Sequence, residues 1–248
     1  MCIRDRPENV DASLVEDCGF ANNTATNGGA IDVSSLSTTV GIRTSSFDHN
    51  YASGNGGALS GSSTAIITIA DSTMANNAAG ESGGVAFASA SELTLTNVTM
   101  TGCSAGDAGG CVGLTGEGTP GSFYSCTWAS CNATRFGGGV AALNDVSGLT
   151  IKDGAFSQCR VQEQGGAVRA SGSTMLRVEN TSFDDCSVDY SAEPICLTLT
   201  MVNPVGYGWE GAELFVFKKE DYHGDMRYLC PRTCSLGAQI ESYSCDHQ

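Results

Sequence analysis

The sequence predicts an all-β fold, a parallel β-helix (solenoid) of about seven coils followed by a small C-terminal β module. Three patterns predict it, and all three recur with the same phase along the chain. The first is a Gly-Gly pair, which begins at Gly28, Gly56, Gly83, Gly109, Gly138 and Gly165. The second is an aromatic residue or Met followed by Asn or Cys: Phe47/Asn50, Met74/Asn77, Met100/Cys103, Trp128/Cys131, Phe156/Cys159 and Phe183/Cys186.

The third pattern is a pair of apolar positions just before each aromatic residue or Met. The pairs are Val40/Ile42, Ile67/Ile69, Leu93/Leu95, Gly121/Phe123, Leu149/Ile151 and Leu176/Val178. Alternation with period two is typical of a strand with one buried face. A unit of short strands and Gly, Ser, Asn and Asp corners has to stack on copies of itself to bury that face. Equivalent residues then form ladders at the spacing of paired strands, about 4.8 Å.

We expect three segments along the chain. Residues 1–6 are similar to a translated sequencing-library adapter, and we expect them to be a scar outside the fold. Residues 7–196 hold the β-helix repeats, from a partial first coil at Val15–Cys18 to an opening at Ala192–Ile195 that has lost both glycines. Residues 197–248 follow another pattern and are expected to form a Cys-containing β module, cut off near Gln248.

The repeats resemble those of the polymorphic outer membrane proteins first described in chlamydiae. The resemblance rests on Gly-Gly-Ala-Ile (28–31), Gly-Gly-Ala-Leu (56–59) and Gly-Gly-Ala-Val (165–168), each followed by Phe-x-x-Asn or a variant. It covers about residues 15–196 and implies a right-handed β-helix displayed outside the cell, in the outer membrane if bacterial, often acting in adhesion. The chain departs from the pattern where Cys replaces the motif Asn, at positions 103, 131, 159 and 186.

The C-terminal segment is similar to a small β module of secreted protist proteins. That module carries Gly-Asp-Gly-Trp-Asn-Gly-Ala and, further on, a Cys pair. Here Gly206–Ala212 matches it with Tyr207 and Glu210 substituted, and Cys230 and Cys234 are candidates for the pair.

The formal net charge of −15, with only 12 Lys and Arg, argues against a nucleic-acid-binding protein, which needs a basic surface. We interpret the charge as a solvated acidic surface, with a cation-binding role as the alternative. No apolar run reaches membrane-spanning length. The expected partner is therefore a protein or glycan of a host or neighbouring cell, and no cofactor or metal is expected.

Cysteine usage suggests an exported protein. Apart from Cys2 there are eleven cysteines, spread along the coils and not clustered as in a zinc site. The one tight pair, Cys230 and Cys234, leaves a zinc site with His223, Cys245 and His247 as an alternative.

Stacked cysteines in neighbouring coils fall within disulfide reach. We expect the bridges Cys103–Cys131 and Cys159–Cys186, with a single Cys131–Cys159 bridge as the alternative. The competing interpretation is that these cysteines are small buried apolar residues, and both interpretations fit an oxidising compartment.

Two polar columns invite a metal or sugar site, but a structural role is the better interpretation, because stacked amides and hydroxyls satisfy backbone groups that a corner leaves open. They form the predicted corner ladder, which comprises Asn50, Asn77, Asp71, Asn97, Asp153 and Asn180. Four Asn-x-Ser/Thr sequences also occur, and Asn22 and Asn132, in long corners, are the candidate glycosylation sites.

We expect a non-enzymatic structural or adhesive protein and predict no catalytic residue. The alternative is a polysaccharide lyase or glycosidase on a β-helix scaffold, which needs carboxylates on neighbouring coils. The predicted outward column after the Gly-Gly pairs has no two adjacent carboxylates; it reads Asp32, Ser60, Phe87, Gly113, Ala142 and Arg169.

Overall fold

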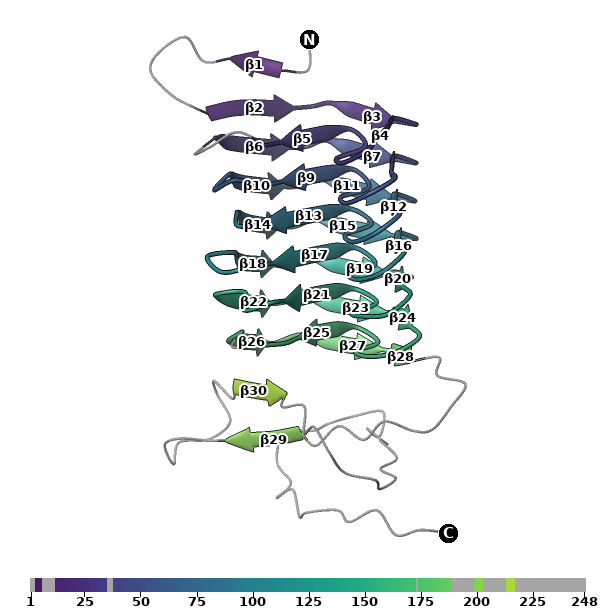
Figure 1. The fold of residues 1–248 in the computed structure, drawn as a ribbon, viewed down its shortest axis with the longest axis vertical. Helices are drawn as coiled ribbons and strands as arrows, with labels where there is room; N and C mark the ends of the chain where they lie inside the picture. The colour runs from purple at the N-terminus through teal and green to yellow at the C-terminus, as the bar shows by residue number, and fades with distance from the viewer. Residues whose placement is uncertain are drawn as a thin grey trace. The chain divides into compact units, whose positions relative to one another are not determined.

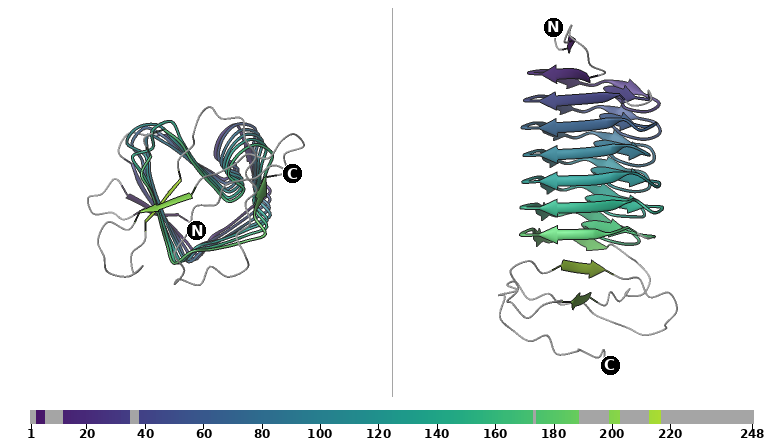
Figure 2. Two further views of the ribbon diagram at one scale, coloured as in Figure 1. Left: turned by 90° about the horizontal axis from the view of Figure 1, so that it is seen from below. Right: turned by 90° about the vertical axis from the view of Figure 1, so that its left-hand side faces the viewer.

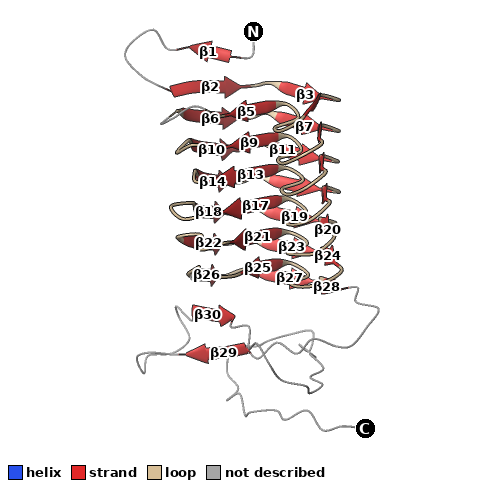
Figure 3. Cartoon of the chain, viewed as in Figure 1, coloured by secondary structure: helices blue, strands red, loops and turns tan. Residues whose placement is uncertain are grey.

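The computed structural model describes residues 3–5, 12–34, 38–172, 174–188, 199–202 and 213–216. Every regular element in these ranges is a β-strand (Figures 1 and 3). The chain divides into two compact units, Met1–Asp189 and Tyr190–Gln248. The first unit is a stack of parallel coils, so the predicted all-β parallel β-helix is confirmed. None of the described segments is an apolar helix long enough to cross a bilayer.

Four sheets, named A to D here, run along the stack. Sheet A contains β1 (Ile3–Asp5), β2 (Ala12–Glu16), β6 (Thr39–Arg43), β10 (Ile66–Ala70), β14 (Glu92–Thr96), β18 (Pro120–Tyr124), β22 (Gly148–Lys152) and β26 (Leu176–Glu179). Sheet B contains β3 (Gly19–Ala21), β7 (Ser46–Asp48), β11 (Thr73–Ala75), β15 (Thr99–Thr101), β19 (Thr127–Ala129), β23 (Ala155–Ser157) and β27 (Ser182–Asp184).

The other two sheets complete each coil. Sheet C contains β4 (Thr24–Ala25), β8 (Tyr51–Ala52), β12 (Ala78–Ala79), β16 (Ser104–Ala105), β20 (Asn132–Ala133), β24 (Arg160–Val161) and β28 (Ser187–Val188). Sheet D contains β5 (Ile31–Val33), β9 (Leu59–Gly61), β13 (Ala86–Ser89), β17 (Val112–Thr115), β21 (Val140–Leu143) and β25 (Val168–Ala170). Six coils therefore have all four strands, and β26 to β28 form the first three strands of a seventh.

The core consists of columns of equivalent residues. In sheet A, Ile69 pairs in parallel with Ile42 on one side and Leu95 on the other, and all three side chains are buried. The inner column of sheet B holds Phe20, Phe47, Met74, Met100, Trp128, Phe156 and Phe183. Its rings stack face to face, with centroids 4.2 Å apart for Trp128 and Phe156. The predicted aliphatic and aromatic registers are therefore those of the core, except in the last coil, where Phe183 is exposed.

The corner between sheets A and B explains one predicted polar column. Its residues all have a left-handed backbone, with φ between 44° and 54°: Asp17, Thr44, Asp71, Asn97, Ser125, Asp153 and Asn180. Asn and Asp tolerate this conformation better than other residues with a side chain. Backbone geometry thus favours short polar side chains at this corner in every coil.

The fifth Gly-Gly pair begins one residue earlier than predicted. In the other coils the first glycine has a positive φ, as at Gly109 (64°) and Gly165 (74°), and in the fifth coil Gly137 (59°) takes this place. β21 accordingly pairs Ala141 with Gly113, and Ala142, predicted to point outward, lies in the core. Three consecutive glycines, 137–139, made two frames compatible with the sequence pattern, and strand pairing selects one.

The two ends of the chain differ from the repeats. β1, within the segment expected to be a scar, pairs antiparallel with β2 at the edge of sheet A. In the second unit, β29 (Leu199–Val202) and β30 (Glu213–Val216) form an antiparallel pair. The predicted boundary at 196/197 and the remainder of the C-terminal module lie outside the described residues.

The register makes a direct prediction. We expect Ile69→Asp and Leu95→Asp each to destabilise the solenoid by at least about 3 kcal/mol, because an unpaired carboxylate would enter the core. Ala70→Asp and Thr96→Asp, on the outer face of the same strands, should change stability by about 0.5 kcal/mol or less. Thermal melts followed by circular dichroism compare the pairs, and equal losses would contradict the register.

Candidate functional site

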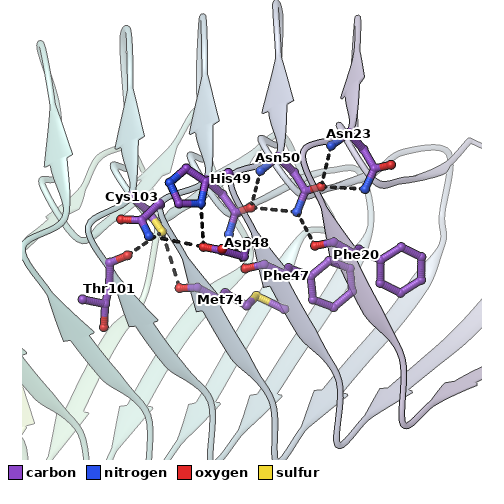
Figure 4. A network of polar contacts seen from close by, with 11 residues as sticks. Phe20, Asn23, Phe47, Asp48, His49, Asn50, Met74, Thr101 and Cys103 are labelled. Carbon is purple, nitrogen blue, oxygen red and sulfur yellow. Dashed lines mark hydrogen bonds and ion pairs between the residues drawn. The ribbon is translucent and has the colours of Figure 1, made fainter.

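The predicted Asn50/Asn77 corner between sheets B and C is a hydrogen-bonded ladder (Figure 4). The Oδ1 atom of Asn77 accepts from the backbone N–H of Asn50 (3.0 Å) and from its Nδ2 (2.9 Å). The Nδ2 of Asn50 also donates to the carbonyl of Phe20 (3.1 Å). Asn23 extends the ladder by one coil, with its Nδ2 2.8 Å from the Oδ1 of Asn50. These amides are occupied by the corner itself, so they serve the fold.

Cysteine continues this ladder with a simpler bond. The thiol of Cys103 lies 3.6 Å from the carbonyl of Met74, and that of Cys159 lies 3.6 Å from the carbonyl of Trp128. Each thiol thus meets the carbonyl of the preceding coil's core residue, as the Nδ2 of Asn77 does at Phe47 (3.0 Å). The replacement of Asn by Cys therefore keeps a side-chain hydrogen-bond donor at the corner and loses the amide oxygen as an acceptor.

The exposed ladder at the A–B corner pairs carboxylates with neutral donors. The Nδ2 of Asn97 donates to the Oδ1 of Asp71 (2.7 Å), and the Nδ2 of Asn180 donates to that of Asp153 (2.6 Å). An open hollow of about 470 Å³ lies beside Asp71 on this corner. Because no aromatic or large apolar side chain lines it, it is a weak candidate for a ligand site.

A second ladder at this corner was not predicted from the sequence. In five of the seven coils, the position after the left-handed residue holds a small side chain whose hydroxyl or thiol meets the carbonyl two residues earlier; the exceptions are Val98 and Gly154. The distances are 2.6 Å for Ser45, 2.7 Å for Ser72 and 3.3 Å for Cys126. The recurrence of Ser, Cys or Thr directly after the polar column is the sequence signal that would have identified it.

The cysteine pairing differs from the expected one. Cys131 forms a disulfide with Cys111, with Cα atoms 5.6 Å apart, and Cys103 is a buried free thiol. Stacked residues project in parallel, so their Cβ atoms keep the strand spacing of about 4.8 Å, longer than the 3.8 Å typical of a disulfide. Cys111 follows Gly109-Gly110 and directly precedes β17, so it approaches Cys131 from a different part of the coil.

The other predicted pairing, Cys159–Cys186, involves two thiols in contact. A hydrogen bond between the two sulfurs raises the pKa of Cys159 and lowers the pKa of Cys186. Cys159 is buried, whereas Cys186, in the last coil, is partly exposed. Their oxidation to a disulfide stays a prediction. Cys230 and Cys234, with the alternative zinc ligands, lie outside the described residues.

The two candidate glycosylation sites lie on the surface. Asn22 and Asn132 are both exposed, next to or in sheet C. The Nδ2 of Asn132 donates to the carbonyl of Ser130 (3.2 Å), a single bond that leaves the side chain accessible. Within the part of the chain that the structure describes, no three His, Cys, Asp or Glu side chains are grouped closely enough to hold a metal ion.

A concave site lies between sheet D and the loops that follow sheet C. Seen along the axis, these loops turn back toward sheet D (Figure 2, left). The hollow between them, here called the D hollow, has a volume of about 220 Å³ and is lined by Asn55, Glu81, Phe87, Asp107, Gly113 and Asn144, among others. It spans neighbouring coils, so residues distant in sequence share it.

Small residues lie at the base of the D hollow. Gly113 follows Phe87 in the outward column of sheet D, and an added Cβ would lie 3.1 Å from both the Phe87 ring and the backbone nitrogen of Gly83. Ala108 and Ala141, both buried, also line the hollow. The partly exposed Phe87 ring therefore lies against Gly113, where a larger residue would be crowded, and forms part of the wall of the hollow.

The wall of the D hollow has a charge pattern that the sequence analysis missed. Glu81 and Asp107 occupy the same position in adjacent coils, since the N–H of Asp107 donates to the carbonyl of Glu81 (2.7 Å). Glu81 accepts a bond from the Nδ2 of Asn55 (3.0 Å), and Asp107 pairs with Arg135 (3.1 Å). The predicted outward column contains no such pair, because these carboxylates lie in the loop before the glycines.

One coil beyond, Phe136 lies beside two guanidinium groups. Arg135 and Arg169 are 4.7 and 5.2 Å from the centroid of its ring. Arg169 donates to Gln164, and burial lowers its pKa. Two positively charged side chains therefore lie together at Phe136, and one of them, Arg135, pairs with Asp107 in the wall of the D hollow.

Comparison with known proteins found no matching family model, no similar curated protein and no similar solved structure.

The disulfide makes the first prediction for this region. We expect Cys111→Ala to lower the free energy of unfolding by about 3 kcal/mol, the chain-entropy value for a loop of this length. Cys103→Ala, which removes a buried thiol that forms no disulfide, should cost about 1 kcal/mol. Denaturant unfolding measures both, and non-reducing peptide mapping should recover a Cys111–Cys131 peptide. A Cys103–Cys131 peptide in its place would refute the pairing.

The free thiols make the second prediction. Cys186 should be alkylated at neutral pH, because the bond from Cys159 lowers its pKa and favours the thiolate. Burial raises the pKa of Cys103 and of Cys126 to about 11, so both should react only on unfolding. Labelling of Cys186 should slow as the pH falls. It should also slow at neutral pH in Cys159→Ala, and an unchanged rate there would show that the thiol contact has no such effect.

Proposed function

We propose that this chain is a non-enzymatic extracellular or cell-surface protein whose β-helix acts in structural display and adhesion. The observation that carries the proposal is the buried disulfide between adjacent coils of a regular solenoid. Structural disulfides form and persist in oxidising compartments, so the bond favours export. The resemblance of the repeats to surface-displayed proteins points the same way.

The solenoid suits display because its side faces are rigid and repetitive. Each coil bonds to the next through four sheets and through side-chain ladders at two corners. A partner protein or glycan would meet a surface whose side chains are held in fixed columns, which lowers the ordering cost of binding. The acidic net charge is consistent with such partners and unfavourable for nucleic acid.

One observation favours the alternative, a glycosidase or lyase. Glu81 and Asp107 are carboxylates on adjacent coils, with backbones about one strand spacing apart, and a retaining glycosidase needs two carboxyl groups close together. However, Asp107 is ion-paired with Arg135, and Glu81 accepts a hydrogen bond from the amide of Asn55. Both carboxylates are therefore already bonded to side chains of the solenoid, so we prefer the binding role.

Two assays test the proposal. The whole chain, immobilised on beads, should bind cells saturably and be displaced by soluble protein, whereas heat-denatured protein should not bind. Purified chain should release no reducing or unsaturated sugar ends from pectin, alginate or xylan above the denatured control. Cleavage that disappears in Glu81→Gln would establish the enzymatic alternative and overturn the proposal.

A further inference from the structure

We propose that the D hollow binds one neutral sugar ring of a glycan. The inference rests on the proposed adhesive function and names the site and the ligand class through which adhesion would act. Its evidence is the combination of an aromatic wall, a mixed polar rim and a small volume at one place on the solenoid.

The aromatic wall provides a surface for the apolar face of the ring. Phe87 is partly exposed and lines the hollow, and its ring lies against Gly113, the next position in the same column. Binding sites combine such apolar surfaces with a few placed polar groups. A pyranose has the matching character, with C–H groups on one face and hydroxyls around its edge.

The rim offers both acceptors and donors. Glu81 and Asp107 present carboxylate oxygens, and Asn55 and Asn144 present amides, each with an acceptor and two N–H donors. The Nδ2 of Asn144 donates to the hydroxyl of Thr115 (3.0 Å), which orients that amide. Sugar hydroxyls both donate and accept hydrogen bonds, so they can bond to the acceptors and to the donors of the rim. An ion would interact only with the acceptors or only with the donors.

The charges around the hollow favour a neutral ring. The negative charge of Asp107 is offset by Arg135, and Glu81 is already bonded to Asn55. An acidic sugar would bring a third carboxylate next to these two, which is electrostatically unfavourable. A cationic side chain is the competing ligand, because carboxylates and an aromatic ring also attract cations.

The volume limits the ligand to about one ring. At about 220 Å³ the hollow is smaller than the 300–1,000 Å³ of sites that enclose drug-sized ligands. A single ring should bind weakly, with a Kd of about 1 mM. Many chains displayed on one surface would raise the avidity without any further contact.

The experiment uses the whole chain and isothermal titration with methyl glycosides of neutral hexoses, methyl glucuronide and methylammonium. At least one neutral hexoside should bind, and the other two probes should not. Phe87→Ala should weaken that binding by about fivefold to tenfold. Asn144→Gly, which suits the left-handed backbone there (φ 59°), should weaken it by about threefold.

Two matched variants distinguish binding at the D hollow from a general effect of losing an aromatic side chain, and a sugar ligand from a cationic one. Tyr124→Ala removes an exposed aromatic side chain from sheet A and should leave binding unchanged. Glu81→Gln keeps the size of the side chain and should weaken hexoside binding by about threefold or less, whereas a cationic ligand would lose about tenfold or more. Circular-dichroism melts check that each variant is folded.

The inference is overturned if no neutral hexoside binds, if Phe87→Ala binds as the unmodified chain does, or if methylammonium binds and the sugars do not. Cell binding in the bead assay without sugar binding would leave the adhesive function intact and refute this site alone. Sugar binding without cell binding would support this site and refute the adhesive function.

Discussion

Parallel pairing of each coil with the next is the constraint on which the rest of this structure depends. It places a strand residue of an inner coil between the equivalent residues of the two neighbouring coils, at the spacing of paired strands. A side chain in such a column has to pack well against the equivalent side chains above and below it. Aliphatic and aromatic side chains satisfy this by packing, as in the stack of Trp128 on Phe156.

Charged side chains repel one another when they stack, and the columns show how the chain offsets that repulsion. At the A–B corner, Asp71 is followed by Asn97, and Asp153 by Asn180, so each carboxylate has a neutral donor beside it. Next to the D hollow, Asp107 is paired with Arg135 (3.1 Å), which also pairs with Glu163 (3.5 Å). Exposed pairs of this kind contribute little stability each, but they remove repulsion that would otherwise repeat along the axis.

The amide and the thiol are two solutions for one corner. Asn uses both ends of its amide, so Asn23, Asn50 and Asn77 join neighbouring coils through side chains and backbone. Cys keeps only the bond to a carbonyl, as at Cys103 and Cys159. The disulfide from Cys131 to Cys111 links the coils in this part of the stack covalently, where the amide bonds are missing.

The D hollow lies where the repeat is irregular. A perfect repeat would give a uniform groove beside sheet D. Where Phe87 is followed by Gly113, with Ala108 and Ala141 beside it, the surface instead carries the D hollow. The repetition provides rigidity, and its local irregularity provides the hollow that we propose as a sugar site.

The sequence by itself determined the class of fold, the inward columns and the corner columns, because a repeated pattern with period two leaves one way to bury its apolar face. Only the tertiary structure decided the frame at Gly137–Gly139, the partner of Cys131 and the pairing of Glu81 with Asp107 beside Phe87. Sequence columns report which residues stack along the axis. They do not report which columns face each other across the coil, since that depends on the path of the loops after sheet C, and both the disulfide and the D hollow lie between different columns.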